Sequence, residues 1–321
     1  MKILIVTGMT LPEVTDEEMK AIYVASGEGD IVVVNSADEA RDHWPDAEVA
    51  MGILDRETFP SARNLRWLHS TAAGADMLMY PEMVASEVQI TGEKGLVGEH
   101  LADHAFGLLL TLTRQLKRAT LEAPKSWPSR PSMRKVMWEL SGHTLGIVGL
   151  GGTGRSVARR ARAFGMDVIA VDSEKVEKTA EVSELWGMDR FHDMLGRSDV
   201  VVVCCPLTPE TRGLFNDAAF AAMKPGAYLV NVTRGPIVDA DSIVRALKAG
   251  KLGAAGLDVT PIEPLPEDHE LWTFPNVMIT PHTAGASQYR AGRNVQRFVT
   301  NLGHYRNGTS MEGVIDKSKG F

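Results

Sequence analysis

Cysteine is nearly absent from this sequence of 321 residues: it has only two, Cys204 and Cys205, and they are adjacent. Neighbouring residues of an extended run point to opposite faces, so a disulfide between them would be strained, and a disulfide-stabilised secreted scaffold is excluded. The sequence also lacks an apolar run long enough to span a membrane, and the apolar run of residues 1–6 is too short for a signal peptide. These absences predict a cytoplasmic protein.

Excess positive charge is lacking too. The 34 Lys and Arg against 41 Asp and Glu give a net charge of −7, which argues against a general nucleic-acid or anionic-membrane surface. No cluster of side chains has metal-ligand spacing, so we expect no metal site. The composition, 44% hydrophobic and 23% charged, is typical of a globular chain. Its length predicts two domains, or one large α/β unit, each able to bury its own core.

Two series of strand-like segments divide the chain. In residues 1–96, apolar runs alternate with helix-compatible segments, at 3–6, 31–34, 49–53, 65–69 and 88–90. The second series is stronger, at 144–148, 168–172, 200–204, 227–232, 254–259 and 277–280. Such alternation predicts parallel βαβ architecture in an α/β protein, and six strands suit a doubly wound dinucleotide-binding sheet.

Helical patterns lie between and after these series. Leucines at helical spacing from Leu101 to Leu116 predict one long helix that begins near Gly98. Prolines in residues 124–131 exclude a helix interior, and we expect an interdomain element there. A last helix over about 284–306 has an apolar face and is expected to return to the first domain.

A glycine-rich turn follows the strand at 144–148. Gly149-Leu150-Gly151-Gly152-Thr153-Gly154 is a GxGxxG motif that opens a helix-compatible run. The motif predicts that Gly149 allows the tight turn, that Gly151 lets the backbone approach a pyrophosphate, and that Gly154 lets the helix lie close to the strand. Glycine-rich turns also serve backbone geometry alone, so a second signal is needed.

Asp172 is that second signal. It ends the strand at 168–172 and lies 21 positions after Gly151, near the spacing at which a carboxylate meets the adenosine ribose. A carboxylate repels a 2′-phosphate, and Ser173 follows it rather than an arginine. The glycine-rich turn and Asp172 together therefore predict NAD as cofactor, with NADH preferred over NADPH.

Three ionisable residues follow later strands, where open α/β sheets bind their ligands. Arg234 closes Asn-Val-Thr-Arg-Gly, Glu263 lies in the proline-rich loop of residues 257–266, and His282 lies in Thr-Pro-His-Thr-Ala-Gly. A guanidinium can hold a carboxylate with two hydrogen bonds, and an imidazole beside a carboxylate can donate a proton. Each residue alone is equally compatible with a surface ion pair, a solvated loop acid or a structural histidine.

In this order after GLGGTG, these fragments resemble the D-isomer-specific 2-hydroxyacid dehydrogenase family. The resemblance includes LRWLHSTAAGAD at 65–76, VGEH at 97–100 and PLTPET at 206–211. It implies that Arg234, Glu263 and His282 form the catalytic set. Protonated His282, oriented by Glu263, would donate a proton to the carbonyl oxygen of a 2-oxo acid, and Arg234 would bind the substrate carboxylate.

The resemblance also implies the binding residues. Amides of Ala73 and Gly74, with Arg234 and His282, would bind the substrate. The cofactor set would be Val97, Gly149, Gly151, Gly152, Thr153, Gly154, Arg155, Asp172, Cys205, Pro206, Thr211, Val232, Thr233, Arg234, Asp258 and His282. We do not expect Cys205 to act as a nucleophile.

The resemblance implies an architecture of two Rossmann-like domains. A flavodoxin-like substrate-binding domain would comprise residues 1–96 plus 292–321, and an NAD-binding Rossmann domain, residues 97–291, would be inserted into it. A homodimer would form through the nucleotide-binding domain, with residues 127–138 near the contact.

Three activities fit the sequence. The first is NAD-dependent interconversion of a small 2-oxo acid and its D-2-hydroxy acid, with Thr260 pointing to glyoxylate or hydroxypyruvate. The second is an NAD(H)-sensing interaction protein on the same fold without significant turnover. The third, formate oxidation, is disfavoured because related enzymes have Gln at the position of Glu263.

Overall fold

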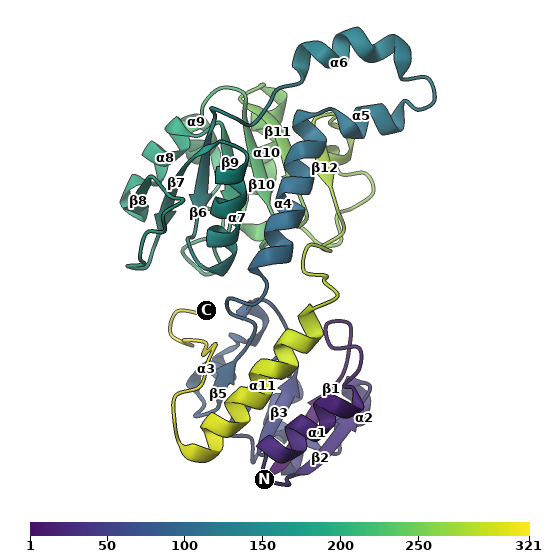
Figure 1. Cartoon of the computed structure of the whole chain (residues 1–321), viewed down its shortest axis with the longest axis vertical. Helices are drawn as coiled ribbons and strands as arrows, with labels where there is room; N and C mark the ends of the chain where they lie inside the picture. Colours follow the sequence, from purple (N-terminus) through teal and green to yellow (C-terminus); the bar gives the residue numbers. More distant parts are fainter. The chain divides into compact units, whose positions relative to one another are not determined.

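The computed structural model describes all 321 residues and divides into two compact units (Figure 1). The first unit is Met1–Val97 with Ala286–Phe321, and the second is Gly98–Gly285. Val97 and residues 286–291 therefore lie in the first unit, whereas the sequence-based bounds put them in the second. No helix has the length and apolar character needed to cross a membrane.

The first unit has a five-stranded parallel sheet in the order β2-β1-β3-β4-β5. Its strands are β1 (Lys2–Val6), β2 (Asp30–Val34), β3 (Val49–Gly52), β4 (Trp67–Ser70) and β5 (Gln89–Thr91). Its helices are α1 (Asp16–Ala25), α2 (Ala37–Ala40), α3 (Pro81–Ala85) and α11 (Arg290–Asn307). This strand order is that of flavodoxin-like folds, as the sequence analysis expected.

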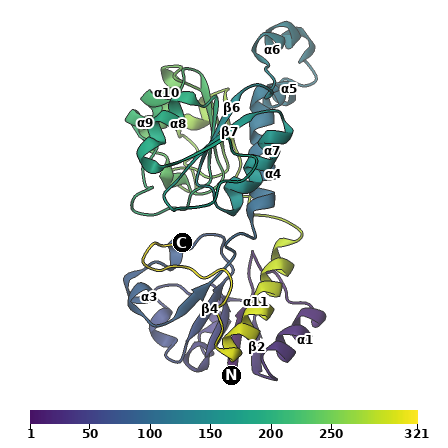
Figure 2. The same ribbon diagram turned by 60° about the vertical axis from the view of Figure 1, so that its left-hand side comes forward.

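Alternate side chains of β1 enter two different cores, because successive residues of a strand point to opposite faces. Ile3 and Ile5 pack with Phe298 of α11 and with α1, which lie side by side in Figures 1 and 2. Leu4 and Val6 pack with residues of α2 and α3 on the other face. Both faces of the sheet are therefore buried, which explains its nearly continuous apolar strands.

The second unit has a seven-stranded parallel sheet in the order β12-β11-β10-β9-β6-β7-β8. Its strands are β6 (Thr144–Val148), β7 (Asp167–Asp172), β8 (Glu184–Gly187), β9 (Val200–Val203), β10 (Ala227–Asn231), β11 (Leu252–Leu257) and β12 (Val277–Ile279). Its helices are α4 (Gly98–Thr113), α5 (Leu116–Leu121), α6 (Arg130–Val136), α7 (Gly152–Ala163), α8 (Phe191–Arg197), α9 (Asp217–Ala222) and α10 (Ala240–Lys248). Counted from β6, the order is that of a dinucleotide-binding sheet with one strand added, which confirms the predicted doubly wound α/β fold.

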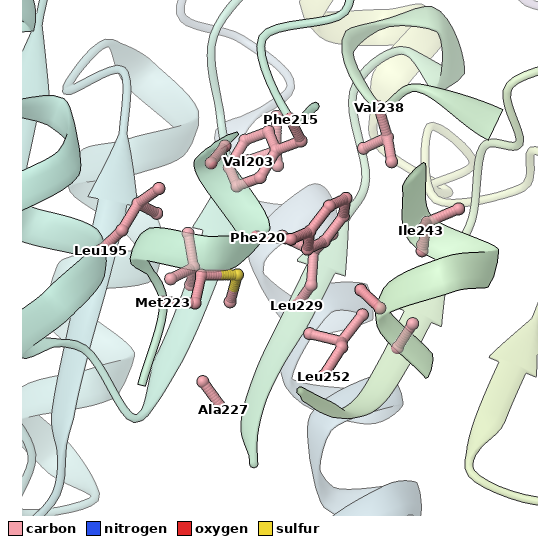
Figure 3. Close-up of a cluster of buried hydrophobic side chains, with 14 of the residues drawn as sticks. Leu195, Val203, Phe215, Phe220, Met223, Ala227, Leu229, Val238, Ile243 and Leu252 are labelled. Atoms are coloured by element: carbon pink, nitrogen blue, oxygen red, sulfur yellow. The ribbon is translucent and has the colours of Figure 1, made fainter. Parts of the chain in front are cut away.

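Helices cover both faces of this sheet. On one face α4 packs against β11 so closely that a Cβ at Gly256 would lie 2.9 Å from the Cβ of Leu108. On the other face, α8, α9 and α10 enclose an apolar core with side chains such as Phe220, Leu229 and Ile243 (Figure 3).

Four further details differ from the sequence analysis. The predicted long helix ends at Thr113, because Gln115 has a left-handed backbone (φ 57°), and α5 follows as a separate helix. The edge strand β8 was not predicted. The proline-containing segment lies within the second unit, between α5 and α6, and is not an interdomain element. The last helix begins at Arg290 and not near residue 284.

Candidate active site

The glycine-rich turn lies between β6 and α7 and has the geometry that the motif predicts. Gly149 has φ 94°, and a Cβ there would lie 2.8 Å from the backbone nitrogen of Cys205. A Cβ at Gly154 would lie 2.1 Å from the carbonyl oxygen of Gly149, so only glycine lets α7 approach the strand. At Gly151 a Cβ would meet open space, and no side chain caps α7. These features fit a dinucleotide pyrophosphate bound at the helix N-terminus.

This turn lies at the topological switch point of the sheet. β6 pairs with β7 on one side and with β9 on the other, so the connections leave in opposite directions, and open α/β sheets bind their ligands at such a point. Asp172 ends β7 and accepts hydrogen bonds from the backbone nitrogens of Leu150 (2.6 Å) and Glu174 (2.8 Å). The carboxylate is therefore fixed beside the glycine-rich turn.

Other predicted cofactor residues have partners within the protein. The guanidinium of Arg155 donates to the carbonyl oxygens of Leu150 (3.2 Å) and Glu177 (2.8 Å). Thr211 donates from its hydroxyl to the carbonyl oxygen of Pro206 (2.7 Å), which orders the loop after β9. Burial raises the pKa of Cys205 to about 12, so its thiol stays protonated and is a poor nucleophile.

The three predicted catalytic residues follow β10, β11 and β12, which are neighbours in the sheet. Because these strands are parallel, their carboxyl ends lie at one edge. Arg234 precedes Gly235, where a Cβ would lie 1.7 Å from the carbonyl oxygen of Thr260, so the loops after β10 and β11 are in contact. The predicted set thus lies on loops at one edge of the sheet in the second unit.

His282 and Glu263 form a hydrogen-bonded pair, with Nδ1 of the imidazole 2.8 Å from Oε2 of the carboxylate. The other carboxylate oxygen accepts from the backbone nitrogen of Thr260 at 3.0 Å, which fixes Glu263 within its loop. Both side chains are partly exposed. His282 has a left-handed backbone (φ 53°), an uncommon conformation for a residue with a Cβ. Such strain persists only where the surroundings hold the residue in place.

Asp258 supplies that support. Its buried carboxylate accepts from the hydroxyl of Thr280 (2.6 Å) and from the backbone nitrogens of Thr283 (2.9 Å) and Ala284 (2.9 Å). Burial alone would raise its pKa, but these hydrogen bonds and one from His104 lower the pKa of Asp258 to about 2. The backbone nitrogen of His282 also donates to the carbonyl oxygen of Asp258 (2.8 Å). Asp258 thus holds the backbone at 283–284 against the end of β11, and α11 begins only at Arg290.

Sequence reasoning missed two residues here. His104 of α4 lies 2.8 Å from the Thr280 hydroxyl through Nε2 and 3.3 Å from the Asp258 carboxylate. Asn231, fully buried at the end of β10, donates to the carbonyl oxygen of Arg234 (2.9 Å) and accepts from the backbone nitrogen of Thr233 (3.1 Å). It fixes the backbone from which Arg234 projects. Its only sequence signal was its place at a strand end.

The remaining predicted residues divide between the units. Val232 is buried directly after β10, and Thr233 donates from its hydroxyl to Asn231 (3.3 Å). Ala73, Gly74 and Val97 belong to the first unit, where the loop with Ala73 and Gly74 follows the carboxyl end of β4. No group of three or more metal-binding side chains is arranged to hold a metal ion.

Comparison with known proteins identifies relatives of the whole chain. Residues 106–284 match the family model of the D-isomer specific 2-hydroxyacid dehydrogenase NAD binding domain. The glyoxylate reductase of Korarchaeum cryptofilum is 35% identical over 269 residues, which covers 82% of this chain and 80% of the relative. A D-isomer specific 2-hydroxyacid dehydrogenase family protein from Aeromonas salmonicida has a TM-score of 0.80 at 30% identity, covering 98% of this chain and 99% of that one. A family member from Xanthobacter autotrophicus, solved in complex with NADPH and MES, has a TM-score of 0.81 at 25% identity, covering 99% of both chains.

A doubly wound sheet with this turn at its switch point, matched by an NAD-binding domain model, defines the class: an oxidoreductase that uses a nicotinamide dinucleotide. The chain belongs to the D-isomer specific 2-hydroxyacid dehydrogenase family. The resemblance seen in the sequence is therefore confirmed.

Proposed function

We propose that the protein reduces a small 2-oxo acid, of the glyoxylate or hydroxypyruvate type, to its D-2-hydroxy acid with NADH. The observation that carries this proposal is the His282–Glu263 pair at the strand edge shared with Arg234. Relatives named as glyoxylate reductases support the substrate type.

The cofactor site fits a nicotinamide dinucleotide. Gly151 and the uncapped N-terminus of α7 would receive the pyrophosphate, Asp172 the adenosine ribose, and the loops after β9 and β10 the nicotinamide end, with Cys205 and Thr233. When bound, NADH supplies the hydride that the carbonyl carbon of the substrate accepts.

The residues of the chain carry out the rest of the reaction. Arg234 binds the substrate carboxylate with its planar guanidinium and stabilises the negative charge that grows on the carbonyl oxygen. Protonated His282 donates a proton to that oxygen, and the carbonyl becomes a hydroxyl group. Glu263 holds Nδ1, so the proton is given from Nε2. Amides of Ala73 and Gly74 complete the binding of the carboxylate.

NADH is the proposed cofactor because the fixed carboxylate of Asp172 would repel a 2′-phosphate. A structural relative was solved with NADPH, so the preference needs its own test. Oxidation of NADH and of NADPH should be followed over a panel of 2-oxo acids that includes glyoxylate, hydroxypyruvate and pyruvate. We expect turnover with NADH. Asp172→Ala should reduce the ratio of the turnover rate with NADH to the turnover rate with NADPH. Binding of NADH without turnover of any acid would instead favour the NAD(H)-sensing function.

We also propose a homodimer formed through the second unit. The segment from α5 to α6 projects from this unit (Figure 1). It exposes apolar side chains, with Leu121 74% and Trp127 76% accessible. Apolar side chains exposed on one projecting segment are compatible with an interface to a second copy. Sedimentation should give a dimer at micromolar concentration, and Trp127→Glu should give a monomer.

Both cysteines are free thiols, which supports a cytoplasmic location.

A further inference from the structure

The first unit has a buried polar network that the proposed chemistry does not use. His69, Thr91 and Asn294 are fully buried, and Glu93 is almost so. His69 comes from β4, Thr91 from the end of β5, Glu93 from the segment after β5, and Asn294 from α11. Burying so many polar groups is costly unless each has a partner, so the pattern of their bonds is informative.

The bonds of this network fix one direction for every proton. The amide nitrogen of Asn294 donates to Glu93 (2.9 Å), so its oxygen must accept from Nε2 of His69 (2.6 Å). In the neutral imidazole Nδ1 then has no proton and accepts from the hydroxyl of Thr91 (2.6 Å), which itself accepts from Nε1 of Trp67 (2.8 Å). Burial lowers the pKa of His69 to about 4, so the imidazole is neutral at physiological pH.

Arg290 joins this network to the loop. It is the first residue of α11, and its guanidinium donates from Nε (3.0 Å) and Nη2 (2.7 Å) to the carboxylate of Glu93. The same Nη2 donates to the carbonyl oxygen of Thr71 (3.3 Å), at the start of the loop with Ala73 and Gly74. A buried ion pair contributes little net stability, but here two hydrogen bonds to Glu93 hold the guanidinium in one orientation.

We propose that Arg290 is a positioning residue for substrate binding: held by Glu93, it fixes the carbonyl oxygen of Thr71 and so the amides of Ala73 and Gly74. This inference rests on the proposed function, which assigns the substrate carboxylate to those amides. Arg290 itself contacts neither substrate nor cofactor in this mechanism. Its effect should therefore appear in the binding of the acid and not in the transfer of the hydride or proton.

The test compares Arg290→Lys with Arg306→Lys. The first substitution keeps the positive charge beside Glu93 but removes the planar fork that reaches Thr71, whereas Arg306 donates to the carbonyl oxygen of Ala25 at the far end of the same helix. For Arg290→Lys we expect KM for the 2-oxo acid to rise about tenfold, with kcat changed less than about threefold and KM for NADH unchanged. Arg306→Lys should leave all three values as in the wild type.

A second variant guards against a folding effect. Glu93→Gln combined with Arg290→Met removes both charges together and leaves no unpaired charge buried. It should raise KM for the acid at least as much as Arg290→Lys does. Wild-type KM values in both variants would overturn the proposal, and so would a loss confined to kcat.

Hydrogen exchange separates this inference from the proposed function. The amides of Thr71 and Ala72, which donate to the carbonyl oxygen of Gly52 and to the hydroxyl of Ser70, should exchange about tenfold faster in Arg290→Lys than in the wild type or in Arg306→Lys. This measurement needs no turnover, so it decides the role of Arg290 even if no 2-oxo acid is reduced. Unchanged exchange in Arg290→Lys would overturn the positioning role, whereas absence of wild-type turnover would overturn only the proposed function.

Discussion

Asp258→Asn should destabilise the second unit. The carboxylate of Asp258 is buried, and both of its oxygens accept hydrogen bonds from the loop that contains His282. Asparagine has the same shape but offers an oxygen on one side only. Its amide group must face either the backbone N–H of Ala284 or the donors from Thr280 and Thr283. In either orientation the N–H groups of the amide face at least one donor of the loop, and these donors are left without an acceptor.

The size of the effect follows from the pKa of Asp258, which lies at about 2 instead of 3.8. A pKa difference of one corresponds to about 1.4 kcal/mol, so the native surroundings favour the charged form by about 2.5 kcal/mol. We expect Asp258→Asn to lower the free energy of unfolding by about 2–3 kcal/mol at pH 7. Since the pKa is lowered by folding, this stabilisation is present above about pH 4 and is lost as the pH falls through about 2.

Urea denaturation followed by circular dichroism measures this difference at several pH values. The matched control is Asp268→Asn, an exposed acid of the loop after β11, which should change stability by less than about 0.5 kcal/mol. The difference between the wild type and Asp258→Asn should narrow on acidification below about pH 4. Equal stability at pH 7, or a difference that widens in acid, would refute the reasoning.

Three further predictions concern the nucleotide turn, the catalytic pair and the thiols. Gly154→Ala should weaken NADH binding by more than about tenfold, measured by fluorescence titration, because its methyl group would overlap the carbonyl oxygen of Gly149; unchanged affinity would contradict the packing of α7. Glu263→Gln should lower kcat by about 10²-fold with little change in KM, in steady-state assays, because His282 loses the charge that holds it; a change in KM alone would argue against this role. Cys205, with its raised pKa, should react with iodoacetamide at neutral pH only after denaturation. Labelling of Cys205 in the native protein, detected by mass spectrometry, would contradict this prediction.

The sequence predicted the two sheets well because their strands are buried on both faces. Runs such as residues 200–203, four valines in succession, can hardly be anything but interior strands. The edge strand β8 was not predicted because its four residues, Glu-Leu-Trp-Gly, have no such pattern. The end of α4 was predicted wrongly because the leucine spacing does not indicate the left-handed backbone of Gln115.

The candidate site was predictable only in part. The glycine-rich turn and Asp172 form a local pattern with a physical reason for each residue. The pairing of Glu263 with His282 came from resemblance, since no spacing rule joins residues from two different loops. The contact between Glu93 and Arg290 joins residues 197 positions apart, and only the folded sheet brings them together.

The most direct test of the account is a single-turnover measurement of NADH oxidation by a 2-oxo acid, in the wild type and in His282→Asn, with NADH affinity measured on the same samples. The account predicts that the variant binds NADH within about threefold of the wild type, whereas the rate of NADH oxidation falls by at least about 10²-fold. A variant that oxidises NADH at the wild-type rate would contradict the assignment of His282 as the proton donor.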